Sequence, residues 1–454
     1  MYKLQTFNQQ HIPNNRTKTD LNINEPFKVP FFVISLHTQE SMFQYSMKKR
    51  VVITGMGVYS CIGKNTEEVL LSLYHGKSGI GLDPQRKELG YRSSLTGILE
   101  TPNLKGILDR KQRATLPEEG MYAYTATCEA LKQANIDLDF LDKNEVGILY
   151  GNDSTAQSVI TSSDIIREKK DTSLVGSGAI FKSMNSTVTM NLSVIFKLKG
   201  INMTISGACA SGSHAIGLGL MMIQQGLQEM VICGGAQEVN AYCMGSFDGL
   251  GAFSIREDDP AKASRPFDKD RDGLIPSGGA ATVILESYES AIRRGATILG
   301  EVVSYGFSSN GDHISNPNIS GPKRSLEMAV QQAGININDI PYINAHATST
   351  PAGDGKEAQA IASVFSDKKP FVASTKAMTG HEMWMAGASE IVYSILMMQN
   401  DFIAPNTNFE NPDEDTAALN IPAQRVEMAF DCFLSNSFGF GGTNSSLIVR
   451  KFNK

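Results

Sequence analysis

The sequence predicts an α/β protein with parallel strands and a duplicated fold. Short runs rich in β-branched and aromatic residues alternate with helical stretches, which is typical of strands joined by crossover helices. The second half of the chain repeats the order of elements found in the first. At 454 residues the chain is too long for one simple core, so we expect two or three domains or one large double domain.

The predicted elements follow in chain order. A first set of strands is expected at Val51–Thr54, Val146–Tyr150, Met203–Ile205, Met230–Cys233 and Thr282–Leu285. A second set is expected at Gly300–Ser304, Tyr342–Ala345, Val372–Ala373, Cys432–Leu434 and Ser446–Val449. Helices are expected at Thr66–Tyr74, Met121–Gln133, His214–Gln225, Lys323–Ala333, Lys356–Val364 and Gly387–Gln399. Gly226 and Gly334 lie just past two of these helices, where glycine commonly ends a helix.

Corresponding segments of the two sets resemble each other. The strand at Arg50–Gly55 opens the first set, and the strand at Leu299–Gly306 opens the second. The strand, loop and helix around Cys209 resemble those around Lys376–Gly387. We interpret this as an internal duplication with halves at residues 47–296 and 297–454, although any α/β protein shows some similarity of this kind.

The first 46 residues differ in character from the rest. They are polar, rich in Asn and Gln, and without clear periodicity. At Met47 the chain changes to Met-Lys-Lys-Arg-Val-Val-Ile-Thr-Gly, which is typical of a first strand. We expect residues 1–46 to be a disordered extension, or the product of translation from an upstream start codon.

Composition excludes several classes of function. With 41 basic and 47 acidic residues the net charge is -6, which gives no support for nucleic-acid binding but leaves a local basic patch possible. The 6 cysteines are scattered, without the spacing of a zinc site, as expected for reduced thiols in a cytoplasmic protein. No apolar run approaches the roughly 18 residues that cross a membrane.

Cys209 is the first candidate for chemistry. It lies in the run Ser-Gly-Ala-Cys-Ala-Ser-Gly-Ser-His-Ala, directly after a predicted strand and before a predicted helix. The unpaired N–H groups and the dipole of a helix N-terminus favour a thiolate, and they can bind an oxyanion at an acyl carbon attached to the sulfur. A lone cysteine is more often structural, but the small neighbours of Cys209 let a substrate approach.

Two polar loops supply further candidates. His346 stands at the end of a predicted strand, a position suited to a site at the carboxyl edge of a sheet. Thr348 and Thr350 follow it and could hydrogen-bond a polar ligand arm. Lys376 and His381 lie in the run Ser-Thr-Lys-Ala-Met-Thr-Gly-His before a predicted helix and could join the same pocket. The alternatives are structural histidines and a solvated lysine.

A glycine-rich turn is the last candidate. Residues 435–444 are Ser-Asn-Ser-Phe-Gly-Phe-Gly-Gly-Thr-Asn and lie between two predicted strands. The segment lacks the lysine of a P-loop and the spacing of a dinucleotide-binding motif. We therefore expect a tight turn that brings a backbone N–H and the aromatic ring of Phe440 close to a reacting centre.

Taken together, these motifs resemble those of the β-ketoacyl-acyl-carrier-protein synthases, in the family's order and approximate spacing. Arg-Pro-Phe-Asp-Lys-Asp-Arg-Asp-Gly at 265–273 adds to the resemblance, and Ser-Gly-Gly-Ala at 277–280 is closest to synthase I. The resemblance implies a thiolase-like α/β fold, in which two duplicated βαβαβαββ-type halves form a layered αβαβα structure. It also implies a homodimer, with a heterodimer as the alternative.

The activity that the resemblance implies is decarboxylative Claisen condensation in fatty-acid chain elongation, which is an acyltransferase reaction. Cys209 would carry the acyl group, and His346 and His381 would donate hydrogen bonds to the enolate oxygen. The backbone N–H groups of Cys209 and Phe440 would form the oxyanion hole, and the Phe440 ring would act as a gate.

The resemblance also implies supporting roles. Lys376, with Glu357 as its partner, would tune the charge of the pocket, and Phe438 would support it. Thr348 and Thr350 would hold the pantetheine arm of the substrate. The basic patch for the acyl-carrier protein would be Arg110, Lys111 and Arg113. No metal or cofactor is implied beyond the phosphopantetheine of the carrier protein.

Because several positions depart from the family pattern, the sequence does not predict which acyl chain the protein binds. Ala347 replaces a glycine, Met383-Trp-Met385 replaces Leu-Gly-Ala, and Gly151-Asn-Asp-Ser-Thr155 replaces a glycine-rich segment near the acyl pocket. Trp384, the only tryptophan, would either narrow the acyl channel or fill the core, and we favour core packing.

Three alternative functions remain open. The first is a ketosynthase of a polyketide or aryl-polyene pigment pathway, which the altered pocket segments suggest. The second is a non-catalytic subunit resembling chain-length factors, which would lack the nucleophile. The third is a coenzyme-A thiolase, which would need a second catalytic cysteine, whereas Cys432 is expected inside a strand.

Overall fold

One ten-stranded mixed sheet organises the chain. The computed structural model describes residues 48–366 and 369–452, so the prediction for residues 1–46 lies outside the described residues. The strands of the sheet are β1 (Val51–Ser60), β4 (Gly147–Gly151), β5 (Asn202–Ile205), β6 (Met230–Gln237), β7 (Gly279–Ser287), β8 (Gly300–Ser309), β9 (Tyr342–Asn344), β10 (Phe371–Ala373), β13 (Cys432–Gly439) and β14 (Thr443–Arg450).

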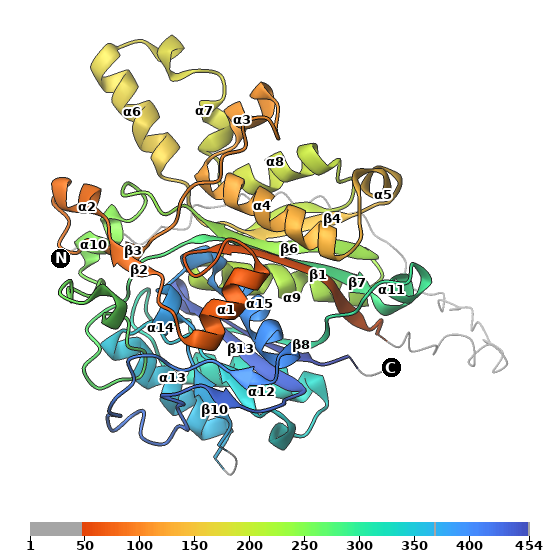
Figure 1. Cartoon of the computed structure of the whole chain (residues 1–454), viewed down its shortest axis with the longest axis vertical. Helices are drawn as coiled ribbons and strands as arrows, with labels where there is room; N and C mark the ends of the chain where they lie inside the picture. Colours follow the sequence, from red (N-terminus) through yellow and green to blue (C-terminus); the bar gives the residue numbers. More distant parts are fainter. Residues whose placement is uncertain (1–47, 367–368, 453–454) are drawn as a thin grey trace, which may run out of the picture. The chain divides into compact units, whose positions relative to one another are not determined.

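Helices cover the sheet (Figure 1). The longer helices are α1 (Thr66–His75), α4 (Glu118–Gln133), α6 (Gln157–Lys169), α8 (Thr187–Phe196), α9 (Ser211–Gln224), α12 (Ser320–Ala333), α13 (Pro351–Val364) and α15 (Ala386–Gln399). Every predicted strand and helix is present, and most extend beyond the predicted bounds by a few residues.

The strand order is symmetric about its centre. It runs β10-β9-β13-β14-β8-β1-β7-β6-β4-β5, so each strand of the first half has a counterpart in the second at the mirrored position. The two halves meet where β1 and β8 pair, through Val52 opposite Glu301 and Ile53 opposite Gly300. This symmetry is what an internal duplication produces.

The expectation of parallel strands is correct only for the outer strands. In each half the outer three strands are parallel, whereas the pairs nearer the centre are antiparallel. In the second half the reason is local, because β13 and β14 are joined by a tight turn that reverses the chain.

The helices form the expected layers. α9 and α15 contact each other and strands of both halves, so they lie between the two halves of the sheet. α4 and α8 cover the strands of the first half, while α12 covers β8 and β14 and packs against α13. α15 is almost wholly buried, with only the last of its residues exposed. The arrangement is the expected αβαβα.

Glycines let the outer helices approach the central strands closely. A Cβ on Gly57 of β1 would lie 2.0 Å from the carbonyl oxygen of Ala126 on α4. A Cβ on Gly306 of β8 would lie 2.0 Å from the carbonyl oxygen of Ser325 on α12. The same close contact therefore recurs at corresponding places in the two halves.

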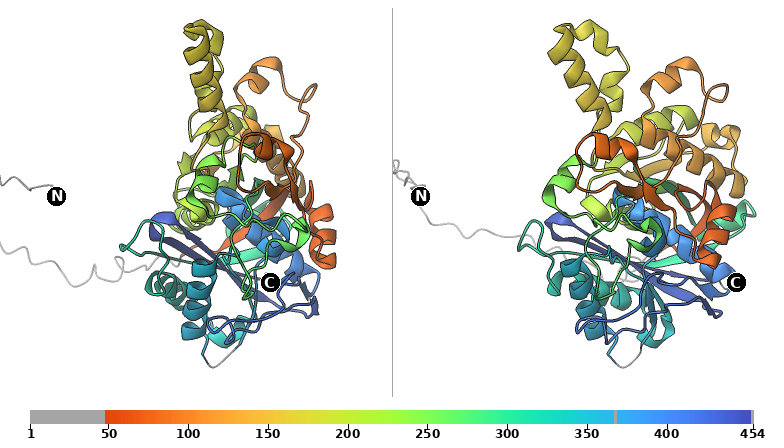
Figure 2. Two further views of the ribbon diagram at one scale, coloured as in Figure 1. Left: turned by 90° about the vertical axis from the view of Figure 1, so that its left-hand side faces the viewer. Right: turned by 60° about the vertical axis from the view of Figure 1, so that its left-hand side comes forward.

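One part of the chain projects from the layers. α6 extends away from the body in all three views (Figures 1 and 2), and the short helix α7 (Ala179–Lys182) returns the chain to the side of α3 (Arg110–Thr115). α6 buries none of its residues, so no core face marks it in the sequence. Within the described ranges, no helix is both long and apolar enough to cross a membrane.

We predict that Gly57→Ala lowers stability, because the added methyl group forces β1 and α4 apart. The expected loss is about 1–3 kcal/mol in the free energy of unfolding, measured by urea denaturation. Gly249→Ala is the matched control, since its Cβ would meet nothing within 4 Å. Equal midpoints for the two variants would contradict the account of this packing.

Candidate active site

Cys209 lies where the sequence placed it, between β5 and α9. A short 3-10 turn at Ala208–Ala210 precedes the first turn of α9, and Ala208 adopts a φ of 47°. The expectation of a thiolate is wrong for this resting site, because burial raises the pKa of the Cys209 thiol to about 12. Lys376 and the backbone N–H groups of Cys209 and Phe440 lower this pKa, but desolvation outweighs them.

The two predicted histidines meet at Cys209. His346 follows β9, and His381 follows the short helix α14 (Lys376–Thr379). Their ring centroids are 5.3 Å apart at 87°, and one donor atom from each ring lies within 4.8 Å of the others and of the Cys209 sulfur. The thiol and the two imidazoles therefore lie close enough together for one small substrate group to contact all three.

Both histidines are neutral. Burial lowers the pKa of His346 and of His381 well below the ordinary value, and the positive charge of Lys376 lowers each further. Nδ1 of His346 and both ring nitrogens of His381 are buried without a hydrogen-bond partner. Unsatisfied buried imidazoles of this kind can donate an N–H to a substrate oxygen.

Lys376 pairs with a residue that the sequence did not indicate. Its side chain is buried, and Nζ binds Oε1 of Glu390 on α15 rather than the expected partner Glu357. Burial raises the pKa of Glu390 to about 7, and Lys376 opposes this rise. The sequence signal for Glu390 is a glutamate directly before the mostly apolar run Ile-Val-Tyr-Ser-Ile-Leu, because a lone carboxylate on a buried helix needs a cation.

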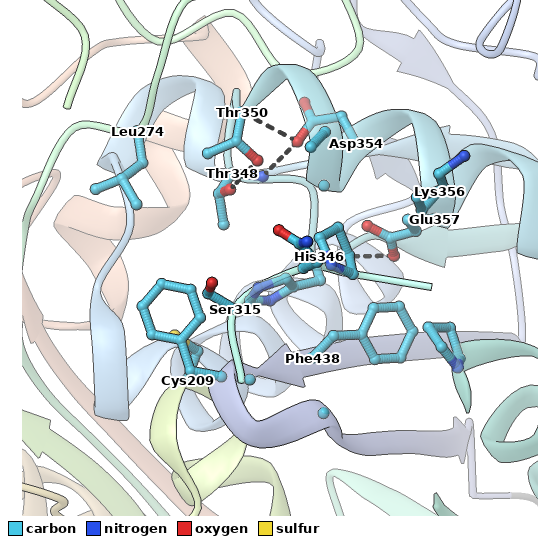
Figure 3. A pocket seen from close by; sticks show the side chains of 18 of the residues that line it. Cys209, Leu274, Ser315, His346, Thr348, Thr350, Asp354, Lys356, Glu357 and Phe438 are labelled. Atoms are coloured by element: carbon cyan, nitrogen blue, oxygen red, sulfur yellow. Dashed lines mark hydrogen bonds between the residues drawn. The ribbon is translucent and has the colours of Figure 1, made fainter. Parts of the chain in front are cut away.

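Glu357 instead fixes the turn that carries His346. From α13 it accepts the backbone N–H groups of His346 at 2.9 Å and Ala347 at 2.7 Å, and Nδ2 of Asn436 at 3.1 Å. Phe438 packs beside the same imidazole, with ring centroids 5.9 Å apart. These contacts hold the ring of His346 in place; Figure 3 shows Glu357 and Phe438 on either side of it.

Phe440 lies in the tight turn between β13 and β14. Gly441 and Gly442 in this turn have φ angles of 77° and 75°, which only glycine adopts without strain. The Phe440 ring is 39% exposed and stacks on Phe247 with centroids 6.0 Å apart. The turn thus places the backbone N–H of Phe440 near the Cys209 thiol and leaves the Phe440 side chain partly exposed.

A cavity of about 290 Å³ opens onto these groups (Figure 3). Cys209, His346 and His381 lie among its lining residues, as do Thr348 and Thr350. The two threonine hydroxyls are 3.2 Å apart. Asp354, which the sequence did not single out, accepts the backbone N–H groups of both threonines and so shapes this wall.

Other sequence candidates lie away from the cavity. Arg110 and Lys111 are exposed on the short helix α3 (Arg110–Thr115), whereas Arg113 is half-buried and donates to the carbonyl of Leu108 at 3.2 Å. Cys432 starts β13 and is absent from the cavity lining, which argues against the two-cysteine chemistry of a thiolase.

The Cys209, His346 and His381 donors could in principle ligate a metal ion. Lys376 opposes this, because the positive charge that lowers both histidine pKa values also disfavours a cation here. The arrangement suits a neutral substrate carbonyl, which gains from two N–H donors and from the positive charge behind them.

Comparisons with known proteins agree with this geometry. The model of the β-ketoacyl synthase N-terminal domain matches residues 48–291, and that of the C-terminal domain matches residues 299–410. The chain is 40% identical over 408 residues to 3-oxoacyl-[acyl-carrier-protein] synthase 1 of Haemophilus influenzae, covering 89% of this chain and 100% of that protein. The Escherichia coli K12 protein of the same name is 40% identical over 406 residues, covering 89% and 99%.

Solved structures show the same fold. A β-ketoacyl synthase from Burkholderia phymatum superposes with a TM-score of 0.85 at 35% identity, covering 89% of this chain and 100% of that one. The ishigamide ketosynthase/chain length factor superposes with a TM-score of 0.82 at 29% identity, with the same coverage. The expected thiolase-like fold is confirmed, and the chain belongs to the β-ketoacyl synthase family.

Proposed function

We propose that the protein is a β-ketoacyl-acyl-carrier-protein synthase that elongates fatty-acyl chains by decarboxylative condensation with malonyl-carrier protein. The observation that carries the proposal is the convergence of one thiol and two neutral imidazoles within 4.8 Å, at the end of a cavity open to substrate. A non-catalytic subunit would not need these three groups together. The relatives named 3-oxoacyl-[acyl-carrier-protein] synthase 1 support the same activity.

In the first half-reaction Cys209 takes the acyl group. Its sulfur bonds to the thioester carbonyl carbon, the carbon–sulfur bond to the carrier breaks, and the thiol proton ends on the leaving sulfur. Because the pKa of the thiol is about 12, the proton must leave as the bond forms, and a neutral imidazole within 4.8 Å can carry it. The oxyanion binds the backbone N–H groups of Cys209 and Phe440.

In the second half-reaction the malonyl group occupies the cavity. Its thioester oxygen accepts hydrogen bonds from His346 and His381, and this stabilises the enolate that forms as carbon dioxide leaves. The enolate carbon attacks the acyl carbonyl, and the carbon–sulfur bond to Cys209 breaks. The released thiolate takes up one proton, so each condensation consumes one proton overall.

The carrier protein supplies both substrates on a phosphopantetheine arm, so no separate cofactor is needed. Thr348 and Thr350 line the cavity and can hydrogen-bond the amides of this arm. Arg110 and Lys111 present exposed positive charge that suits an acidic carrier. We place the enzyme in the cytoplasm, since its 6 free cysteines suit a reducing compartment.

We propose a homodimer. β5 is an edge strand of the ten-stranded sheet, and its Met203 is exposed. Phe181 of α7 lines the same hollow as Asn202 of β5, and α6 and α7, which bury none of their residues, also expose Ile166 and Ile180. An unpaired edge beside exposed apolar side chains is a surface that a second copy can cover.

We predict that Cys209→Ala abolishes condensation without unfolding the protein. The methyl group cannot carry an acyl chain, so the rate of β-ketoacyl product formation should fall at least about 1,000-fold, while the melting temperature changes by only a few degrees. Cys209→Gln should release carbon dioxide from malonyl-carrier protein without forming product, because the histidines remain. Product from either variant at wild-type rates would refute the assignment of the nucleophile.

We predict that reversing Arg110 and Lys111 to glutamate weakens use of the carrier protein. The kcat/KM for acyl-carrier protein should fall roughly tenfold at low salt, and the loss should shrink as salt increases. Turnover of acyl-pantetheine, which lacks the acidic protein, should be unchanged. Lys143→Glu, on the exposed face of another helix, is the control. An equal loss of kcat/KM in that variant would contradict the assignment of carrier binding to Arg110 and Lys111.

We predict that the protein in solution has twice the mass of the 49.2 kDa chain, as measured by light scattering after size exclusion. Met203→Lys on the edge strand should shift the monomer–dimer equilibrium toward the monomer, because the charge would be buried at the interface. Lys132→Glu, on α4, should leave the mass unchanged. A wild-type monomer at micromolar concentration would contradict the homodimer.

A further inference from the structure

The oxyanion hole is assembled from two segments that lie far apart in the sequence. The backbone N–H groups of Cys209 and Phe440 both lie near the Cys209 sulfur, since both lower the pKa of its thiol. The first belongs to the turn that precedes α9, and the second belongs to the turn between β13 and β14. Among the described residues, two hydrogen bonds join α9 to β14, and side chains make both of them.

His214 makes one of these two bonds and contacts both segments. Its Nε2 hydrogen-bonds Oγ1 of Thr443, the residue that directly follows the β13–β14 turn, at 2.7 Å. Its ring also lies against Gly207, two residues before Cys209, because a Cβ on Gly207 would come within 3.0 Å of the ring. One side chain on the first turn of α9 therefore connects the two halves of the oxyanion hole.

The other ring nitrogen of His214 is anchored to the sheet. Nδ1 hydrogen-bonds the hydroxyl of Tyr305 on β8 at 2.6 Å, and Tyr305 itself is buried. Burial lowers the pKa of His214 to about 4, so the ring is neutral near pH 7. A neutral imidazole has one N–H donor and one acceptor, and can therefore bond both hydroxyls at once. The ring is thus held between β8 and the start of β14.

The reaction steps described above do not use His214. It is absent from the residues that line the cavity, so it acts only through the segments that it contacts. An oxyanion hole works when both N–H groups point at the same oxygen, and losing one donor costs about 100- to 1,000-fold in rate. Gly441 and Gly442 allow the turn many conformations, so contacts outside the turn must fix the direction of the Phe440 N–H.

We propose that His214 is a positioning residue, which holds the turn before Cys209 and the start of β14 at the separation where both N–H groups bind one oxyanion. The proposal rests on the function proposed above and adds a residue to its machinery. It concerns the acyl carbonyl oxygen, which becomes negative in both half-reactions. It does not concern malonyl decarboxylation, in which His346 and His381 bind the enolate oxygen.

Two amide variants separate the two hydrogen bonds of His214. The amide of His214→Gln can take the place of Nε2 and keep the bond to Thr443, whereas that of His214→Asn can take the place of Nδ1 and keep only the bond to Tyr305. We expect His214→Asn to slow acyl transfer to Cys209 about 10- to 100-fold at saturating acyl-carrier protein, with KM changed less than about twofold. His214→Gln should stay within about threefold of wild type. Intact mass measures the transfer.

Malonyl decarboxylation supplies a readout that a general disturbance of the site would also move. In Cys209→Gln protein, adding His214→Asn should change the release of carbon dioxide less than about twofold, because this step uses the two histidines of the cavity. Ser213→Ala is the matched control. It removes the other bond between α9 and β14, which joins Ser213 to Ser445 at 2.6 Å, further from the β13–β14 turn, and should leave acyl transfer within about threefold of wild type.

Wild-type acyl transfer in His214→Asn would overturn the proposal, and so would equal losses in the Asn and Gln variants. A parallel loss of decarboxylation would overturn it too, because the effect would then not be specific to the oxyanion hole. Absence of any acyl adduct on Cys209 in wild type would instead overturn the proposed function. If His214→Asn fails to fold, Thr443→Val removes the same hydrogen bond from the other side and should show the same selective loss.

Discussion

The burial of one positive charge is the constraint on which the site depends. Lys376 is 1% exposed, and such a charge is tolerated inside a protein only with a partner, here Glu390 on the central helix α15. The field of Lys376 lowers the pKa of His346 and of His381 and opposes the rise in the pKa of Cys209. Burial keeps the imidazoles neutral as N–H donors, and the charge of Lys376 adds to this effect and favours negative charge on the substrate.

The symmetric fold brings these groups together. Cys209 follows β5 and precedes α9, while Lys376 and His381 follow β10 and precede α15, which occupies the mirrored position. Because α9 and α15 pack against each other between the halves of the sheet, their N-terminal turns meet. The first copy of the fold supplies the nucleophile, and the second supplies the histidines and the charge that tunes them.

Much of the fold and of the candidate site could be predicted from the sequence. The strands and helices of the core carry strong apolar patterns, and the site residues lie in short, compact motifs. The partner of Lys376 could not be predicted, because α13 and α15 each offer a buried glutamate and only the three-dimensional packing selects Glu390 over Glu357. The thiolate expectation failed for a related reason. Position at a helix N-terminus is visible in sequence, whereas the desolvation that outweighs it is not.

The protonation state of the two histidines tests the central claim most directly. Nitrogen NMR of 15N-histidine protein, assigned with His346→Ala and His381→Ala, follows each imidazole between pH 5 and 8. Because burial and Lys376 lower both pKa values, we predict that both rings become protonated only at a pH well below 6.5 in wild type. Either ring titrating with a pKa near 6.5 in wild type would contradict the claim that burial, aided by Lys376, holds the site's histidines as neutral donors.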